Sequence, residues 1–404
     1  MTTTRVCVAG GGPAGIMLGL LLARHGIDVV VLEKHDDFFR DFRGDTVHPS
    51  TMNLLDALGL RAGFDAIPHH PLTMLDVVAN GVRVHAVDFT TLPRPNNFLT
   101  LMPQWDLLDL LASEGARHPS FDLRMGTEVI DVLHDAGRVS GVRVRDSDGE
   151  SKVRADLVIA ADGRDSTVRR RVGLRPAARG VPADVVWFRL PHPSRHVPDT
   201  LAWLSEAGML ITIPRPDYLQ CGFLIPKGRF DDMRAEGIER FRARVARGSP
   251  PLTEVTDHIV SFDDVKLLSV QIDRLPTWTA PGVLCIGDSA HAMSPAFGVG
   301  INYAVQDAVA AARILVPVLT RGGGHAEIDR AAARVQRRRA WPTAMMQRIQ
   351  QVVHRAIANG RAVRVLDNPP TRAQRAVMRV AIPVARPLVA RMVGYGFRPE
   401  RLSG

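Results

Sequence analysis

Three stretches of the chain combine a continuous apolar run, a short polar turn and apolar residues at helical spacing. The runs lie at 5–9, 157–161 and 283–286, and the helical spacing follows at 17–24, 167–172 and 304–312. A continuous apolar run of this length is typical of a strand that is buried on both faces of a parallel sheet. Strands that alternate with helices therefore predict an α/β fold with a mainly parallel sheet.

The pattern changes between about 181 and 273. Four strand-like runs, at 185–190, 200–205, 208–213 and 218–225, follow one another with short turns, before a helix near 238–245 and a strand near 265–272. Consecutive strands with short connections favour an antiparallel sheet. This region therefore predicts a second unit that is inserted between the segments of the α/β unit.

The chain beyond residue 325 is helical in pattern. A long helix is predicted over 326–358, with Pro342 as a kink and with the run Arg337–Arg339 on its exposed side. In the apolar and arginine-rich stretch 374–397, Pro383 and Pro387 favour short helices over one long helix. Earlier in the chain, Ser50 is a natural N-cap for a short helix that ends at Leu58.

The first apolar run carries a nucleotide-binding pattern. Gly10, Gly12 and Gly15 follow it as G-x-G-x-x-G, a helix comes next, and a second strand at 28–32 ends at Glu33. The first glycine permits a tight turn, the second permits the approach of pyrophosphate, and the third permits close packing of helix on strand. An acid at the end of the second strand accepts ribose hydroxyls, so Glu33 favours a dinucleotide with a free 2′-hydroxyl. FAD has such a ribose.

A carboxylate also ends the third apolar run. Asp288 stands where ligands of open α/β sheets bind, and a loop with Pro295, Gly298 and Gly300 leads from it into a helix. Glycines allow backbone amides to approach a ligand, and the positive end of the helix favours negative charge. The loop is therefore predicted to hold a group that becomes anionic, although an ordinary strand, loop and helix would also have this pattern.

Together with Asp162-Gly163 after the middle run, these motifs resemble those of the FAD-dependent aromatic hydroxylases, the p-hydroxybenzoate hydroxylase-like flavoprotein monooxygenases, over roughly residues 4–355. The resemblance implies an α/β fold: a Rossmann-like (GR2-type) FAD-binding domain, an inserted antiparallel β-sheet substrate domain and C-terminal helices. The implied FAD-binding domain comprises 1–67, 100–180 and 274–325. The substrate domain comprises 68–99 and 181–273, and the C-terminal helical segment is 326–404.

The resemblance also assigns residues to FAD. Asp288 would meet the ribityl chain, Arg43 the pyrophosphate region and the backbone of Val129 the adenine, while Asp162 would maintain the geometry near flavin and nicotinamide. The residues expected to contact FAD are Gly10, Gly12, Ala14, Gly15, Glu33, Lys34, Arg43, Gln104, Val129, Asp162, Gly287, Asp288, Pro295, Gly298, Val299, Gly300 and Asn302. His48 is either a proton-transfer group beside the flavin, and so the one catalytic candidate, or a loop residue.

The substrate residues are implied less closely. Arg215 aligns with the position that binds the substrate's carboxylate in p-hydroxybenzoate hydroxylase, and Trp203 falls near its phenol-deprotonating tyrosine. An indole cannot accept a phenol proton, which argues against p-hydroxybenzoate as the substrate. The predicted pocket residues are Trp187, Trp203, Arg215, Phe223, Pro295 and Phe297. The three aromatic residues of the sheet could equally be ordinary core residues.

The function implied is that of a monooxygenase. By the family's mechanism NAD(P)H, a transient co-substrate, reduces FAD, and dioxygen then adds at C4a of the flavin. One oxygen atom passes from that C4a-hydroperoxyflavin to an aromatic or polycyclic small molecule. The small molecule is thereby hydroxylated or epoxidised. Two alternatives stay open: a flavin-dependent reductase or dehydrogenase of the same fold, similar to the prenyl reductases, and a non-catalytic flavin-binding protein. The choice between NADH and NADPH, and between monomer and homodimer, also stays open.

Composition limits the setting of the protein. The chain has 404 residues, 46% of them apolar, and its three cysteines lie in apolar runs without metal-ligand spacing, so we expect a cytoplasmic protein without a metal site. No signal peptide or membrane-spanning apolar run is expected.

The net charge of +9 is concentrated in 330–404, which has 16 arginines and only two acids. Solvent-exposed helix faces explain this best, and the chain has no recognisable nucleic-acid-binding motif. A weak contact of the basic C-terminus with an anionic membrane is a second hypothesis.

Overall fold

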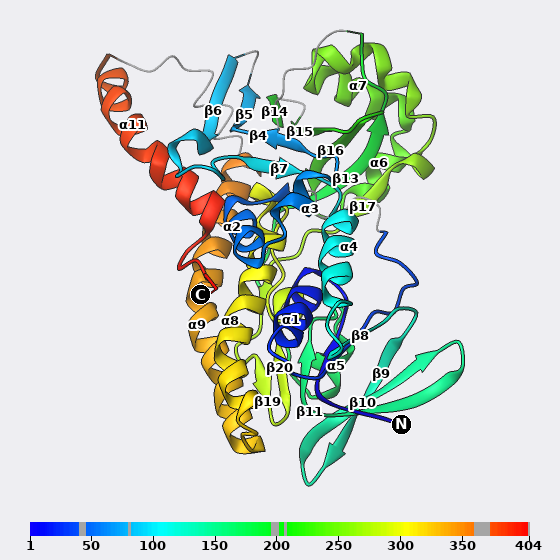
Figure 1. Ribbon diagram of the computed structural model, residues 1–404. Helices are drawn as coiled ribbons and strands as arrows, with labels where there is room; N and C mark the ends of the chain where they lie inside the picture. Colours follow the sequence, from blue (N-terminus) through cyan, green and yellow to red (C-terminus); the bar gives the residue numbers. More distant parts are fainter. Residues whose placement is uncertain (40–45, 80–81, 195–201, 206–207, 359–371, 403–404) are drawn as a thin grey trace.

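The computed structural model describes the chain except at residues 40–45, 80–81, 195–201, 206–207, 359–371 and 403–404. A mainly parallel sheet with its helices forms the lower part of Figure 1, and a second sheet with its own helices forms the upper part. Two long helices, α8 (Gly300–Thr320) and α9 (His325–Ala358), run side by side along the lower part. The predicted α/β class with an inserted sheet and C-terminal helices is confirmed.

The first sheet has eight strands. They are β1 (Thr2–Ala9), β2 (Val29–Leu32), β8 (Phe121–Arg124), β9 (Glu128–Asp135), β10 (Arg138–Asp146), β11 (Gly149–Ala160), β19 (Thr279–Ala280) and β20 (Val283–Cys285). The order is β19-β20-β11-β1-β2-β8, and the hairpin of β9 and β10 pairs with β11. The last four residues of β1 are completely buried, as its continuous apolar run predicted. On one face α1 (Pro13–Ala23) packs against α4 (Gln104–Gly115) and α8.

The second sheet has seven strands in the order β17-β13-β16-β15-β14-β5-β6. They are β5 (Met74–Ala79), β6 (Val82–Asp88), β13 (Ala183–Leu190), β14 (Ala202–Ser205), β15 (Gly208–Pro214), β16 (Leu219–Pro226) and β17 (Lys266–Leu268). Every neighbouring pair is antiparallel except β14 with β5. The antiparallel arrangement predicted for the strands of 181–273 is therefore confirmed. The parallel pair lies where β14 meets β5, which comes from a separate segment, so that no short turn dictates its direction.

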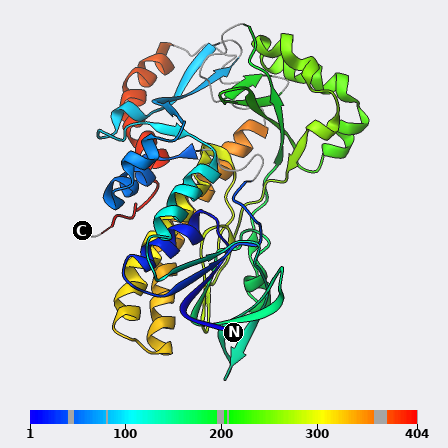
Figure 2. The same cartoon turned by 45° about the vertical axis from the view of Figure 1, so that its right-hand side comes forward.

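Smaller elements join the two sheets. A three-stranded sheet consists of β3 (Thr46–Val47), β7 (Leu99–Leu101) and β4 (His70–Leu72), and β12 (Ala177–Ala178) pairs with β18 (Asp273–Arg274). The short α-helices are α2 (Pro49–Leu58), α3 (Arg61–Asp65), α5 (Thr167–Arg171), α6 (Phe230–Ala235) and α7 (Ile238–Gly248). The 3-10 helices are η1 (Phe89–Thr91), η2 (Pro250–His258), η3 (Phe262–Asp264), η4 (Gly287–Ser289) and η5 (Ala296–Gly298). Figure 2 shows α6 and α7 on the side of the second sheet away from the long helices.

The C-terminal helix departs from the sequence prediction. A single helix, α11 (Arg372–Tyr395), takes the place of the short helices expected around Pro383 and Pro387. It runs beside β6 and η1 at the edge of the second sheet (Figure 1). A proline inside a helix removes one hydrogen bond and crowds the carbonyl four residues earlier. The buried side chains of Ala390 and Val393 hold the helix end against the protein and oppose this cost. Tertiary packing therefore outweighs the local signal.

The predicted cap of α2 is also wrong. His48 occupies the N-cap position and Pro49 the first helical position, where a missing N–H costs nothing. Ser50 lies inside the helix, and its hydroxyl donates to Asn302 Oδ1 at 2.5 Å. This contact joins α2 to α8, so the serine serves tertiary packing and not the end of its own helix.

Arg339 is the largest departure on α9. The prediction that Arg337–Arg339 are exposed holds for Arg337, whereas Arg339 is completely buried. Its position four residues after Val335 and four before Thr343, both fully buried, puts it in the middle of the buried face of the helix. The periodicity of α9 was therefore a better guide to this residue than its charge.

The helical segment Ala296–Thr320 is long and apolar enough to cross a membrane, yet 72% of its most apolar window is buried inside the protein. That degree of burial is typical of a core helix.

Cys7, Cys221 and Cys285 are buried free thiols. Burial raises the pKa of all three thiols, and that of Cys7 and Cys285 to about 12.

Candidate functional site

Four neighbouring strands of the first sheet end at the same edge. Ala9 of β1 pairs with both Ala160 of β11 and Leu32 of β2, and Ala160 pairs with Cys285 of β20. The predicted residues Gly10, Glu33, Asp162 and Asp288 therefore follow strands whose ends are in register. With neighbouring strands about 4.8 Å apart, these four ends span about 14 Å, which suits an extended dinucleotide.

The glycine turn after β1 has two closed positions and one open position. A Cβ on Gly10 would lie 2.4 Å from the Ala161 oxygen, and a Cβ on Gly15 would lie 1.9 Å from the Gly10 oxygen. Gly10 also has a φ of +105°, which side chains disfavour. Among the described residues, and apart from its two chain neighbours, no atom lies within 4 Å of a Cβ on Gly12. The turn therefore leaves its backbone accessible at the glycine that the motif assigns to pyrophosphate.

Glu33 closes the same turn. Its Oε2 accepts the Gly11 N–H at 2.9 Å, its Oε1 accepts the His35 N–H at 3.2 Å, and the residue is 9% exposed. These bonds fix the carboxylate at the end of β2 and beside the glycine turn. The position is the one expected for an acid that accepts hydrogen bonds from a ribose.

The other two carboxylates differ in accessibility. Asp162 Oδ2 accepts the N–H groups of Thr167 and Val168, at 2.7 and 3.2 Å, and so caps the first turn of α5. Burial raises the pKa of Asp162, although the hydrogen bonds it accepts oppose the shift. The Asp288 side chain is 38% exposed and accepts from Arg164 Nε at 3.2 Å. Asp288 is therefore the more accessible of the two carboxylates, and Asp162 supports the local backbone.

The loop before α8 is closely held by β3. The Thr46 hydroxyl donates to the Gly298 oxygen at 2.8 Å, and a Cβ on Gly298 would lie 2.2 Å from Thr46 Oγ1. Phe297 has a φ of +66°, which costs about 1 kcal/mol for a residue with a side chain. The N-cap of α8, Val299, makes no side-chain cap, and no described residue comes within 4 Å of a Cβ on Gly300. The free N–H groups of this helix end provide a place for negative charge.

His48 is fully buried between this loop and α11. Its Nε2 lies 3.1 Å from the Gly298 oxygen and its Nδ1 lies 2.9 Å from the Val393 oxygen. Burial lowers the pKa of His48 to about 4, against the opposing effect of the two carbonyls, so the ring is neutral near pH 7. Both nitrogens face backbone carbonyls, which favours a structural role over proton transfer to a ligand.

The remaining predicted FAD contacts surround the same edge. Ala14 is buried against Gly287, whose own Cβ would lie 3.1 Å from the Ala14 Cβ. Val129 lines a cavity of about 490 Å³ beside β9. The Asn302 side chain is turned inward toward Ser50, so its backbone is the part nearer the loop. Lys34 is exposed, Gln104 and Pro295 are half-buried, and Arg43 lies outside the described residues.

The predicted substrate residues fall on two faces of the second sheet. Trp203 and Phe223 lie in the core between this sheet and α7. Trp187 lies in the core on the opposite face, and Phe297 of the loop packs against that core. Ile211 and Ile213 of β15 also belong to the core on the Trp187 face. Arg215 follows them at the same two-residue spacing, which places it on that face. Trp187 and Phe297 therefore belong to one cluster, with Arg215 on the same face of the sheet and Pro295 in the same loop as Phe297, whereas Trp203 and Phe223 lie on the other face.

Two polar residues of the site were not predicted. Arg164 pairs with Asp288, and it directly follows the Asp162-Gly163 motif, so its sequence position was a usable signal. Asp307 lies within α8, and its Oδ2 accepts the Gly287 N–H at 3.1 Å. Nothing local marks Asp307, because it lies among the apolar residues of that helix.

Within the described part of the chain, no group of three or more His, Cys, Asp or Glu residues could hold a metal ion.

Comparison with known proteins identifies the family of this chain. A family model described as "FAD binding domain" matches residues 3–349. The 6-methylpretetramide 4-monooxygenase of Streptomyces rimosus is 34% identical over 405 residues, which cover 99% of this chain and 94% of that protein.

Two solved structures have a similar fold. PqsL of P. aeruginosa, in complex with 2-aminobenzoylacetate, has a TM-score of 0.76 at 21% identity and covers 91% of this chain and 100% of its own. The anhydrotetracycline hydroxylase OxyS of Streptomyces rimosus has a TM-score of 0.73 at 22% identity and covers 97% of this chain and 76% of its own.

The glycine turn yields a first test. Gly12→Ala should fold normally, because Gly12 has a φ of −75° and open space beside it, and should cost less than about 1 kcal/mol of stability. Its methyl group would occupy the space of a bound pyrophosphate, so FAD affinity should fall. Gly15→Ala is the matched control: overpacking should destabilise the FAD-free protein by about 1–3 kcal/mol. Thermal unfolding and FAD titration measure both. Unchanged FAD affinity in Gly12→Ala would place the cofactor elsewhere.

His48 yields a second test. Its pKa is lower in the folded protein, about 4, than the ordinary 6.5, so the unfolded chain binds the proton more readily between these values. The stabilisation by neutral His48 is complete above about pH 6.5 and decreases as the pH falls toward 4. From about pH 7 to about pH 5 the wild type should lose about 2 kcal/mol more unfolding free energy than His48→Asn. Denaturant unfolding of both proteins measures this, and parallel losses would contradict the assignment.

Proposed function

This chain belongs to the FAD binding domain family and is a FAD-dependent monooxygenase, and we propose that it oxygenates an aromatic or polycyclic small molecule bound between the second sheet and the loop 295–300. The proposal rests on one observation: Phe297 of this loop packs against the apolar cluster on the sheet face that carries Trp187. The name of the similar 6-methylpretetramide 4-monooxygenase favours a monooxygenase over the reductase and non-catalytic alternatives.

The residues present fit FAD. The open glycine turn at Gly12, the fixed carboxylate of Glu33 and the accessible carboxylate of Asp288 lie at neighbouring strand ends. We assign Glu33 to the ribose, Gly12 to the pyrophosphate and Asp288 to the ribityl chain. When bound, FAD takes electrons from NAD(P)H and activates dioxygen for insertion into an electron-rich substrate.

The chain's own groups would orient and stabilise the reacting partners. The first turn of α8 presents its N–H groups to the space beside Gly300, where they would stabilise negative charge by about 0.3–2 kcal/mol. Trp187 and Phe297 offer apolar surface for a planar ring. The Arg215 guanidinium, 9% exposed and held by Gln220 Oε1 at 3.0 Å, would pair with an ionised hydroxyl or carboxylate of the substrate.

Setting and association form a less specific part of the proposal. A cytoplasmic location agrees with the three buried free thiols. Val384 and Leu388 are exposed on α11 near the exposed Arg386 and Arg391, which is the composition that a weak contact with an anionic membrane requires. The proposed reaction is compatible with either a monomer or a homodimer, and it requires no nucleic acid.

Labelled dioxygen tests the function. We expect the FAD-loaded protein, given NAD(P)H, ¹⁸O₂ and either 6-methylpretetramide or anhydrotetracycline as a probe, to release product that carries one ¹⁸O atom. The inserted atom must come from dioxygen, because one of its oxygens is transferred and the other leaves as water. Mass spectrometry of the product measures the label. NAD(P)H oxidation that yields a modified but unlabelled product would establish a reductase or dehydrogenase instead.

The two strand-end carboxylates offer a matched pair of variants. Asp288→Ala should weaken FAD binding by about 10- to 150-fold, since a charge-assisted hydrogen bond contributes about 1.5–3 kcal/mol. It should change the stability of the FAD-free protein little, because Asp288 is partly exposed. Asp162→Ala should instead destabilise the FAD-free protein by about 0.5–2 kcal/mol, since it removes the acceptor at the start of α5. The reverse pattern in FAD titration and thermal unfolding would show that the roles are exchanged.

A further inference from the structure

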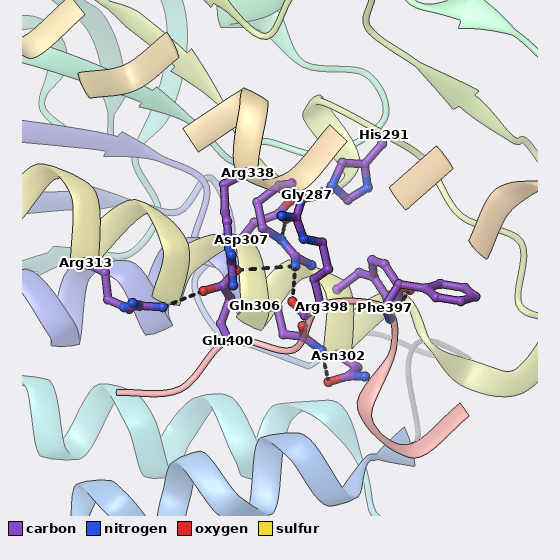
Figure 3. A network of polar contacts seen from close by, with 12 residues as sticks. Gly287, His291, Asn302, Gln306, Asp307, Arg313, Arg338, Phe397, Arg398 and Glu400 are labelled. Atoms are coloured by element: carbon purple, nitrogen blue, oxygen red, sulfur yellow. Dashed lines mark hydrogen bonds and ion pairs between the residues drawn. The ribbon is translucent and has the colours of Figure 1, made fainter. Parts of the chain in front are cut away.

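A completely buried carboxylate lies behind the Gly287–Asp288 turn. Asp307 Oδ2 accepts the Gly287 N–H at 3.1 Å and lies 2.5 Å from His291 Nε2, and its Oδ1 accepts from Arg339 Nε at 2.9 Å (Figure 3). Burial favours the neutral acid, but His291 and Arg339 outweigh it and hold the pKa of Asp307 below its usual value. Asp307 is therefore ionised, and its charge depends on these partners.

Arg339 connects this carboxylate to the C-terminal end of the chain. Its guanidinium is completely buried, lies 5.6 Å from the centre of the Tyr303 ring, and donates from Nη1 to the Arg398 oxygen at 3.4 Å. The same nitrogen is 3.7 Å from Glu400 Oε1. One side chain of α9 thus contacts both the carboxylate behind the turn and the segment that follows α11.

Glu400 completes the charge network. It is 3% exposed, and it accepts from Arg338 Nε at 2.6 Å and from Arg313 Nη1 at 2.9 Å. Glu400 is thereby surrounded by Arg313 of α8 and by Arg338 and Arg339 of α9, and Arg339 also contacts Asp307 (Figure 3). A buried ion that loses its partner is strongly destabilised, so each charge in such a network constrains the positions of the others.

Uncharged contacts dock the same C-terminal residues. Gln306 Nε2 donates to the Tyr395 oxygen at 2.9 Å, and the Phe397 N–H donates to the Tyr303 hydroxyl at 3.3 Å. Val393 supplies the carbonyl that faces His48. The segment 393–400 is therefore fitted against α8, α9 and the residues that hold the loop 295–300. None of these contacts is used in the proposed oxygenation.

The network reaches the cofactor site through Gly287. This residue has a φ of +59°, and its position against Ala14 brings the turn onto the start of α1. The N–H that Asp307 accepts thus belongs to the residue directly before Asp288. A shift of Asp307 would move the Asp288 carboxylate relative to the glycine turn.

We propose that Arg339 and Glu400 are positioning residues for the flavin site, and that docking of the segment 393–400 is coupled through Asp307 to FAD binding. The chain of contacts runs from Glu400 to Arg339, Asp307 and the Gly287 N–H, and it ends beside Asp288. The proposal depends on FAD as the cofactor and not on the identity of the substrate. Its failure therefore leaves the oxygenation proposal intact.

The first experiment measures the FAD dissociation constant by titration of FAD-free protein, followed by flavin fluorescence. Glu400→Gln should raise this constant about tenfold, within the range usual for coupling between sites. Arg339→Lys keeps the charge and should have a smaller effect than Arg339→Met. Arg337→Gln, at an exposed position of the same helix, is the matched control and should bind FAD as the wild type does. A merely structural role predicts a lower unfolding temperature with an unchanged dissociation constant, and that result would overturn the proposal.

The second experiment uses the wild type alone and so does not depend on the variants folding. Coupling is reciprocal, so bound FAD should protect the segment 393–400 from hydrogen exchange. Mass spectrometry compares exchange in FAD-free and FAD-loaded protein, with α7 as the reference for general stabilisation. We expect a larger gain of protection in 393–400 than in α7. An equal or smaller gain would overturn the proposal.

Discussion

The common ending of four parallel strands is the constraint on which the site depends. Hydrogen-bonded register aligns β20, β11, β1 and β2, so that the residue after each strand arrives at one edge. Residues far apart in the chain, such as Gly10 and Asp288, then need no direct contact to serve one ligand. The same edge allows a division of labour, because Asp162 can cap a helix while Asp288 stays accessible.

Buried charge is the second constraint, and it acts over a longer distance. Asp307 and Arg339 are both completely inaccessible to solvent, which is tolerable only because they pair with each other and with further partners. This pairing fixes α8 against α9. The partners of Arg339 include the backbone oxygen of Arg398 and the carboxylate of Glu400, so the same electrostatic requirement determines where the C-terminal segment lies.

The second sheet shows how one element divides its two faces. Phe223 and Trp203 pack on α7, while Trp187 and Ile213 face the loop before α8. Alternation along the strands makes this division inevitable, since neighbouring residues point to opposite faces. The face toward the loop combines apolar surface with Arg215, and it is the face to which we assign the proposed substrate.

The sequence by itself determined the buried strands, the glycine turn and the acids at the strand ends. These depend on interactions within a few residues: an apolar run favours a buried strand, and Gly10 and Gly15 are required by local close approach. The α/β class with an inserted sheet and C-terminal helices followed from the order of those elements, and the flavin-dependent hydroxylase family from the resemblance of their motifs.

The tertiary structure alone decided which face of the second sheet carries Trp203 and that α11 continues through its prolines, and it alone supplied the partner that allows Arg339 to be buried. Each outcome depends on a partner distant in sequence: α7 for Trp203, the buried contacts of Ala390 and Val393 for α11, and Asp307 for Arg339. The charge of Arg339 predicted exposure because an unpaired guanidinium is costly to bury. Only the fold brings the carboxylate that removes this cost.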